Sequence, residues 1–64
     1  MILNTFLKVK GLASSGGEAK TLIRSEKVLL NGEVETRNKK QLAVGDVITV
    51  DGDDFILKQE DIRT

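Results

Sequence analysis

Apolar residues near the start of the chain recur at the spacing that places them on one face of an α-helix. Leu3, Phe6 and Leu7 stand at positions i, i+3 and i+4, which predicts a short helix over residues 3–10. Gly11 follows directly, and a glycine adopts the left-handed backbone conformation that closes a helix without a steric cost. We therefore expect this helix to end at Gly11 in a Schellman-type motif.

A second helical stripe predicts a helix over residues 16–25. Its apolar members are Ala19, Leu22 and Ile23. Ser15 and Glu18 have the Ser-x-x-Glu spacing of a capping box, in which each side chain accepts a hydrogen bond from the other residue's backbone N–H. Gly16 and Gly17 fall in the first turn, where each costs about 0.5–1 kcal/mol relative to alanine. Two such glycines indicate a close approach to this backbone, either by an anion or by a neighbouring helix.

Two short apolar runs, at residues 28–30 and 34–36, predict a β-hairpin. The Asn31-Gly32 dipeptide between them is typical of a two-residue type I′ turn, because both central residues need a positive φ. The residues expected to face the core are Val28, Leu30 and Val34, and those expected to face away are Leu29 and Glu35.

The remaining apolar runs predict two more strands, at Val47–Val50 and Phe55–Leu57, separated by a turn over residues 51–54. Residues 37–41 are polar and basic, which indicates a loop. Asp46 follows Gly45 in a further turn, and we expect its carboxylate to accept hydrogen bonds from local backbone.

The order helix, helix, hairpin, loop, strand, strand predicts an α+β fold, with two short N-terminal helices packed on a small, mostly antiparallel sheet. We expect one domain over residues 1–58 and a polar C-terminal tail over residues 59–64 that frays. The expected core contains Leu3, Phe6, Leu7, Leu12, Ala19, Leu22, Ile23, Val28, Leu30, Val34, Leu42, Val47 and Ile48.

Composition excludes several kinds of chemistry. The 64 residues include no cysteine and no histidine, so a disulfide, a thiol nucleophile and an imidazole base are ruled out. The titratable groups present offer no pairing of a nucleophile with a base, and we expect no enzymatic activity, no small-molecule substrate and no cofactor. The acidic turn at residues 51–54 lacks the glutamate that a calcium loop needs at its twelfth position, where Ile62 stands, so we expect no metal.

The formal net charge is zero, but the charges are segregated along the chain. Residues 1–40 carry eight basic and four acidic residues (8 − 4 = +4), whereas residues 41–64 carry two basic and six acidic residues (2 − 6 = −4). A neutral protein can therefore still present a basic face, although scattered charge on a solvated surface explains the numbers equally well. No apolar run approaches the ~20 residues that span a bilayer, so we expect a cytoplasmic protein with no membrane partner.

These features together resemble the S4-like RNA-binding domain, or αL motif, over about residues 2–50. The matching stretches are residues 6–8, 11–15, 18–20, 22–23, 28–33, 42 and 45–48. Within that family, the Ser-Gly-Gly-Glu-Ala-Lys run and the Arg-x-Lys-Lys-x-Leu run are most similar to small stand-alone bacterial proteins of the YaaA/YbcJ type. The resemblance implies a module that binds structured RNA, such as rRNA or tRNA, without chemistry.

Two positions depart from the family's pattern. Many members have arginines where this chain has Gly16 and Gly17, so backbone amides would replace two phosphate-binding side chains. Many members also end the second helix with glycine, where this chain has Glu26. A non-glycine residue in a left-handed cap costs on the order of 1 kcal/mol, so we expect this helix to end in a different way.

The candidate RNA-binding residues come from the first helix, the second helix and the loop that follows the hairpin. They are Lys8, Ser15, Gly16, Gly17, Lys20, Arg24, Lys27, Arg37, Lys39 and Lys40. The stripe at positions 20, 24 and 27 shares one face if the second helix extends that far. The alternative reading is a well-capped helix with a solvated face and an ordinary basic loop.

Two hypotheses about function remain open at this point. The first is a monomeric, non-catalytic module that recognises structured RNA through its phosphates and works on rRNA, tRNA or the ribosome. The second is a protein–protein interaction adaptor that keeps the S4-like fold without binding RNA, which the zero net charge and the acidic second half favour.

Overall fold

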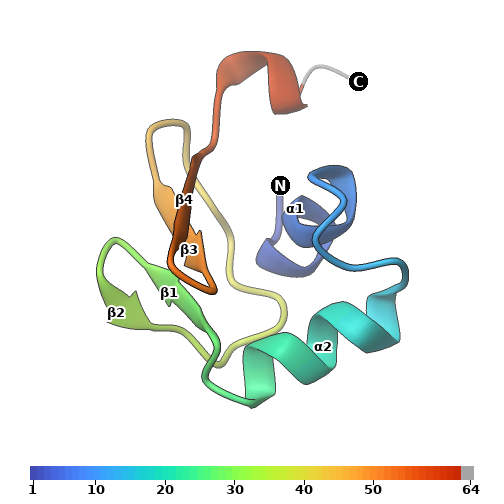
Figure 1. The fold of residues 1–64 in the computed structure, drawn as a ribbon. Coiled ribbons are helices and arrows are strands. Elements are labelled where there is room, and N and C mark those ends of the chain that lie inside the picture. The colour runs from blue at the N-terminus through green and yellow to red at the C-terminus, as the bar shows by residue number, and fades with distance from the viewer. Residues whose placement is uncertain (63–64) are drawn as a thin grey trace.

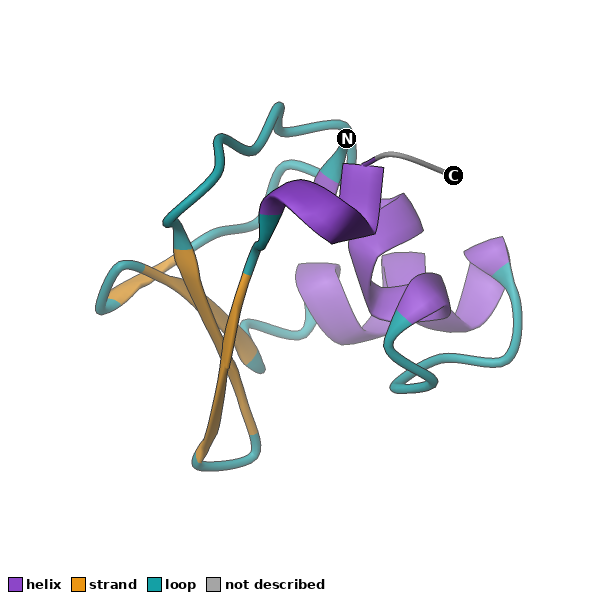
Figure 2. Cartoon of the chain, turned by 90° about the horizontal axis from the view of Figure 1, so that it is seen from above, coloured by secondary structure: helices purple, strands orange, loops and turns teal. Residues whose placement is uncertain are grey.

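The computed structural model describes residues 1–62, which form an α+β fold with both helices on one side of an antiparallel sheet (Figures 1 and 2). The elements are α1 (Leu3–Val9), α2 (Gly16–Arg24), β1 (Val28–Leu30), β2 (Glu33–Val34), β3 (Val47–Val50), β4 (Asp53–Ile56) and the 3₁₀ helix η1 (Gln59–Ile62). This is the predicted fold class. Within residues 1–62, no helix combines the length and the apolar character needed to cross a membrane.

Helix α1 ends as the sequence predicts. Gly11 has a φ of +73°, and its N–H donates to the Lys8 carbonyl at 3.0 Å. The N–H of Leu12 donates to the Leu7 carbonyl at 2.9 Å. These two bonds define a Schellman motif, which turns the chain sharply toward α2.

Helix α2 ends in the same motif, and the expectation of a different ending is wrong. The N–H of Glu26 donates to the Ile23 carbonyl at 3.2 Å and the N–H of Lys27 to the Leu22 carbonyl at 3.3 Å. Glu26 occupies the left-handed position with a φ of +63°. The hydrogen bonds of the cap and the packing on either side hold the glutamate there despite the steric cost of its Cβ.

Glu26→Gly should therefore stabilise the protein by about 0.5–1 kcal/mol, because glycine removes the clash of the left-handed conformation while losing somewhat more backbone entropy on folding. Urea unfolding followed by far-UV circular dichroism measures the change. Glu26→Ala is the matched control, since it removes the same charge but keeps the Cβ. An equal gain from both variants would show that the charge, and not the backbone conformation, sets the cost.

The sheet has the order β2-β1-β3-β4, with every neighbouring pair antiparallel. Its first hairpin is the predicted one: Asn31 and Gly32 have φ values of +51° and +88°, as a type I′ turn requires. The Asn31 side chain and Asp46 also bind one another, with Nδ2 donating to Oδ1 at 3.1 Å. Asp46 Oδ2 accepts from the Ala43 N–H at 2.8 Å, which confirms its turn role and holds the pKa of this carboxyl below its usual value.

The prediction that Val34 faces the core and Glu35 faces away from it is wrong, and the turn explains why. A two-residue turn pairs Leu30 with Glu33 and Leu29 with Val34. Directly paired residues share one face, so Val34 lies with Leu29 on the outer face and is 48% exposed. Glu35 falls on the opposite side and its side chain is mostly covered. The strand also ends at Val34 and not at the predicted residue 36.

Strand β4 begins earlier than predicted. The turn before it contains only Asp51 and Gly52, with φ values of +52° and +83°, and the strand includes Asp53 and Asp54. Val50 pairs with Asp53 and Val47 with Ile56. The alternation along β3 buries its second and fourth residues, Ile48 and Val50. Val47 therefore lies on the outer face, and the prediction that it belongs to the core is wrong.

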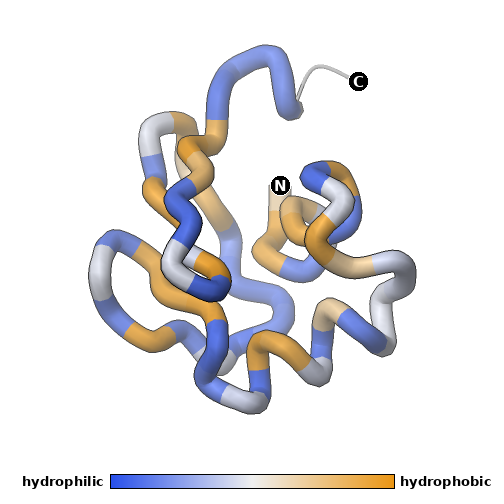
Figure 3. The backbone as a smooth tube through the Cα atoms, in the orientation of Figure 1, coloured by the Kyte–Doolittle hydropathy of each residue, from blue (hydrophilic) through white to orange (hydrophobic). Residues whose placement is uncertain are grey.

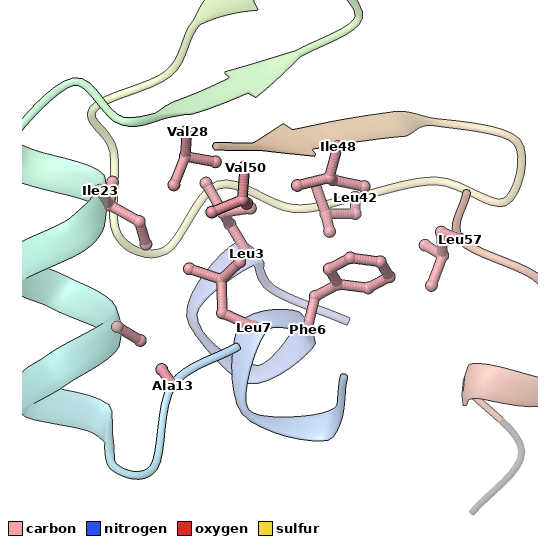
Figure 4. Close-up of a cluster of buried hydrophobic side chains, with 11 residues drawn as sticks. Leu3, Phe6, Leu7, Ala13, Ile23, Val28, Leu42, Ile48, Val50 and Leu57 are labelled. Atoms are coloured by element: carbon pink, nitrogen blue, oxygen red, sulfur yellow. The ribbon is translucent and has the colours of Figure 1, made fainter. Parts of the chain in front are cut away.

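The core lies between α1, α2 and the inner face of the sheet (Figure 4). Its buried members are Leu3, Phe6, Leu7, Ala13, Ala19, Ile23, Val28, Leu42, Ile48, Val50 and Leu57. Phe6 and Leu57 point toward each other beneath Ile48 in this view. The sequence did not predict Ala13, Val50 or Leu57 as core residues, whereas Leu12, Leu22 and Leu30 are only partly buried against the cluster.

Residues 59–62 form η1, which the sequence did not predict. Asp61 Oδ1 lies 2.9 Å from Lys10 Nζ, and Asp61 Oδ2 accepts from the Lys58 N–H at 2.8 Å. These contacts hold the pKa of Asp61 below its usual value, the Lys58 hydrogen bond more strongly. Along the backbone, residues 59–61 and the loop over residues 37–41 are hydrophilic (Figure 3). The last two residues of the predicted tail, 63 and 64, lie outside the described residues.

Candidate nucleic-acid interface

A buried asparagine joins three segments that are distant in sequence. Asn4 of α1 is only 7% exposed, and its Nδ2 donates both to the Gly16 carbonyl at 3.0 Å and to Asn38 Oδ1 at 2.8 Å. Two backbone bonds reinforce this link, from Asn4 to the Asn38 carbonyl at 3.2 Å and from Leu3 to the Lys40 carbonyl at 2.9 Å. The first turn of α2 and the basic loop over residues 37–41 are therefore held against the same end of α1.

The sequence offered little sign of this contact. An asparagine inside a helix is mildly unfavourable, because its side chain competes for backbone hydrogen bonds. Asn4 stands next to Leu3 on the buried side of α1, and its partner lies 34 positions away. An unfavourable polar residue on an apolar stripe was the only available signal, and it does not identify a partner.

The start of α2 has half of the predicted capping box. Ser15 Oγ accepts from the Glu18 N–H at 3.2 Å, as predicted. The Glu18 carboxylate, however, accepts from the N–H and the hydroxyl of Ser14, at 3.2 and 2.9 Å, and not from the Ser15 N–H. The reciprocal half of the box is thus displaced by one residue, because the Ser14 hydroxyl offers a second donor at the same place.

The two glycines of the first turn are not required by packing. A Cβ on Gly16 would lie 3.7 Å from Asn4 Oδ1 and 3.9 Å from Lys8 Nζ, and a Cβ on Gly17 would lie 3.9 Å from Ser15 Oγ. These are ordinary contact distances, and neither glycine has a positive φ. The interpretation that a neighbouring helix demands these glycines is therefore wrong. They leave a turn in which Gly17 is exposed and Gly16 half-buried, with the Lys8 ammonium beside Gly16.

The basic residues of α2 fall along one side of the helix. Lys20 stands one turn after Gly16 and Arg24 one turn further, and both side chains are exposed. Lys27 does not continue this stripe, because α2 ends at Arg24 and the left-handed Glu26 redirects the chain. The predicted face of three cations thus contains two, with Lys27 beyond the end of the helix.

The loop after the hairpin supplies lysines but no free arginine. Arg37 binds Glu35 through Nε–Oε2 at 2.9 Å and Nη2–Oε1 at 3.1 Å, a bidentate pair. The Arg37 hydrogen bonds lower the pKa of Glu35 to about 2, and the pKa of Arg37 is raised in turn by Glu35. Lys39 is exposed and Lys40 half-buried, and neither forms an ion pair with a described residue.

The structure thus separates the ten candidate residues into groups. We use the name basic face for Lys8 of α1, Lys20 and Arg24 of α2, and Lys39 and Lys40 of the loop, together with the Gly16 and Gly17 amides at the start of α2. The other three candidates lie outside this face. Ser15 is the N-cap of α2, Arg37 is paired with Glu35, and Lys27 lies beyond the C-terminal end of α2. The amides at the start of α2 and the positive end of its dipole add to the charge of the lysines.

Metal binding has no comparable support in the part of the chain that is described. Within residues 1–62 no group of three or more acidic side chains is arranged to hold a metal ion. The acidic turn predicted at residues 51–54 is a hairpin turn followed by the start of β4.

Comparison with known proteins matches the chain to a family model and to a bacterial protein. Residues 1–58 match a family model described as S4 domain. A Bacillus subtilis (strain 168) protein named "Probable ribosome maturation protein RlbA" is 40% identical over 50 residues, which cover 78% of this chain and 70% of that protein.

Proposed function

Because the chain belongs to the S4 domain family, we propose that it binds structured RNA, rRNA or tRNA, through the phosphates and without catalysis. The observation that carries this proposal is the link through Asn4, which holds the N-terminal turn of α2 and the lysine-bearing loop against the same end of α1. An RNA-related role agrees with the name of the Bacillus subtilis relative, a probable ribosome maturation protein. We further propose that residues 1–58 act as one domain, in the cytoplasm, as a monomer and without a cofactor.

The chemistry of the basic face favours phosphate recognition over base reading. Its cations are four lysines and one arginine, and lysine acts as a point charge toward phosphate. The chain has two aromatic residues, of which Phe6 is buried in the core and Phe55 is partly buried against it. No exposed aromatic platform is therefore available for stacking unpaired bases within the described chain. Folded RNA, recognised by its shape and its phosphates, is the ligand that this surface fits.

Affinity for RNA should fall steeply with salt. If about four phosphates are neutralised, the logarithm of the binding constant should fall against the logarithm of salt concentration with a slope of about −3 for single strands to −4 for duplex. Fluorescence anisotropy with a labelled RNA hairpin and with total tRNA measures this slope. Lys39→Gln with Lys40→Gln should reduce the slope by about two units, because two phosphate contacts are removed.

Lys58→Gln is the matched control, since Lys58 is an exposed lysine in the acidic half of the chain. It should leave the slope and the affinity almost unchanged. Binding that does not respond to salt, or equal losses from the control and the loop variant, would contradict the proposal.

The adaptor hypothesis keeps one observation in its favour, namely the apolar outer face of the sheet, with Val34 and Ile56 exposed. A pull-down with and without nuclease separates the two functions. If every partner is retained after nuclease treatment and purified RNA does not bind, the adaptor is correct and the RNA proposal fails.

A further inference from the structure

Glu35 holds both the side chain and the backbone of Arg37. Arg37 Nε donates to Glu35 Oε2 at 2.9 Å, and Nη2 donates to Oε1 at 3.1 Å. The backbone N–H of Arg37 also donates to Glu35 Oε2, at 3.0 Å. The N–H of Glu35 donates in turn to the Val28 carbonyl of β1 at 3.0 Å. The carboxylate therefore projects from backbone that is bonded to the sheet, and the guanidinium is fixed against it.

This pairing occupies only one side of the guanidinium. The group has five N–H donors in a rigid plane, which form two forks. Glu35 accepts from the fork of Nε and Nη2, so the fork of Nη1 and the second N–H of Nη2 points away from the carboxylate. The Arg37 side chain is 69% exposed, against 12% for Glu35. Arg37 thus presents two parallel donors to solvent in a fixed direction.

The charge of Arg37 is offset by its partner. The Arg37 hydrogen bonds lower the pKa of Glu35 to about 2, so the carboxylate is ionised at neutral pH. The pair as a whole carries no net charge, and its attraction for a phosphate is weaker than that of an unpaired cation. What the outer fork keeps is its hydrogen-bonding geometry, which suits a neutral group that carries two adjacent acceptors.

We propose that Arg37 determines specificity by binding the O6 and N7 atoms of a guanine in the RNA, and that Glu35 is its positioning residue. These two acceptors match a guanidinium fork, and this bidentate pairing is the commonest specific contact of a basic side chain with a base. The guanine lies in a loop, a bulge or a strand end, because the deep major groove of an RNA duplex hides this edge. The inference rests on the proposed binding of structured RNA and adds one base contact to it.

The loop places this contact beside lysines of the basic face. The Lys40 N–H donates to the Arg37 carbonyl at 3.2 Å, which closes a turn that also contains Lys39. Between them, Asn38 is anchored to Asn4 by its carbonyl and by its side chain. RNA held through its phosphates by the two lysines would therefore have a base within reach of Arg37. Because the guanidinium is already ordered, this contact costs less side-chain entropy than one made by a mobile arginine.

The test uses three fluorescently labelled RNA hairpins that share one stem and one loop of alternating uridine and purine. The loop purine is guanosine, inosine or 7-deazaguanosine. Inosine keeps O6 and N7, whereas 7-deazaguanosine lacks N7. Fluorescence anisotropy should give equal affinities for the guanosine and inosine hairpins, and an affinity about tenfold lower for the 7-deazaguanosine hairpin.

Arg37→Lys assigns this discrimination to the guanidinium. The substitution keeps the positive charge and removes the fork. We expect the preference for guanosine over 7-deazaguanosine to fall below about twofold, with the salt dependence of binding unchanged. A preference that persists in this variant, while its amide spectrum shows an intact fold, would overturn the inference.

Glu35→Gln separates positioning of Arg37 from support of the fold. Glutamine removes the charge and one acceptor oxygen, so Arg37 is released as an unpaired cation. The preference for guanosine should fall below about twofold, while all three hairpins bind more tightly and the salt slope steepens by about one unit. Glu33→Gln is the matched control, because Glu33 is an exposed carboxylate outside the pair, and it should keep the preference. Weaker binding of every hairpin by Glu35→Gln would assign Glu35 to the fold of the loop and overturn its positioning role.

Failure of this inference is distinguishable from failure of RNA binding. If the wild-type protein binds the guanosine and 7-deazaguanosine hairpins equally, with the expected salt dependence, the guanine contact is wrong and the phosphate contacts stand. If no hairpin binds at low salt and total tRNA does not bind either, the proposed function fails and the guanine contact fails with it.

Discussion

Asn4→Ala should lower the free energy of unfolding by about 2–4 kcal/mol, because Asn4 donates two part-buried hydrogen bonds and each acceptor left without its donor costs about 1–3 kcal/mol. Two acceptors lose their donor, the Gly16 carbonyl and Asn38 Oδ1. A domain of this size is stabilised by only about 0.05–0.15 kcal/mol per residue, so the loss is a large fraction of the total. Urea unfolding followed by far-UV circular dichroism measures it.

Asn4→Asp sharpens the test, since it keeps the shape of the side chain and replaces the donor with a carboxylate oxygen. This variant should lose at least as much stability as alanine, because the new oxygen faces two acceptors. Gln41→Ala is the control: it removes an exposed amide whose bond to the Met1 carbonyl is 3.4 Å long. If Asn4→Ala costs no more than this control, the asparagine link is not structural.

The same substitution tests the candidate interface. In Asn4→Ala at a temperature where it remains folded, the amides of Gly16, Asn38 and Lys40 should shift, and affinity for RNA should fall although no cation has been removed. Loss of stability with unchanged RNA affinity would mean that the loop and the start of α2 do not act together. The predicted effect of Lys39→Gln with Lys40→Gln on the salt dependence would not be affected by that outcome.

Phe6→Ala should cost about 3–5 kcal/mol, the range for truncating a buried phenylalanine, and leave the chain largely unfolded at room temperature. Phe6 is fully buried at the centre of the core, where it faces Leu57. Lys10 Nζ also lies 5.7 Å from its ring centroid, and the same ammonium holds Asp61. The truncation therefore removes both core packing and a contact that supports η1.

Ile23→Val is a milder truncation in the same core. It removes one methyl group and should lower the free energy of unfolding by only about 0.5–1.5 kcal/mol. That variant stays folded and gives a measurable midpoint in urea. Val9→Ala, at an exposed position of the same helix as Phe6, should change stability by less than about 0.5 kcal/mol. A Phe6→Ala protein as stable as the Val9→Ala protein would show that this ring is not central to the core.

The local elements follow from short-range chemistry and were predictable. Gly11 ends α1, Ser15 begins α2, and Asn31-Gly32 makes the type I′ turn, because each depends on backbone conformation within a few residues. The outward position of Val34 was also implicit in that turn, since a two-residue loop pairs it with Leu29. The prediction went wrong because it assigned Val34 to the core by its hydrophobicity and did not carry the pairing across the turn.

The candidate interface was predictable in its residue types and not in its arrangement. The lysines could be counted from the sequence. The sequence did not show that Arg37 is paired with Glu35, or that Lys27 lies beyond the end of α2, where Glu26 takes the left-handed position. Both outcomes depend on side-chain positions that periodicity does not describe. The glycines could be interpreted as a packing requirement until the structure showed that a Cβ at either position would make only ordinary contacts.

The sequence by itself determined the helices, the turns, the hairpin, the α+β class and the segregation of charge, because each is a property of neighbouring residues or of their totals. Only the tertiary structure decided that Asn4 joins the start of α2 to the loop 34 positions further on, and that Asp61 returns to Lys10. These are contacts between residues far apart in the chain. They form only when the core brings the segments together, so no local pattern encodes them.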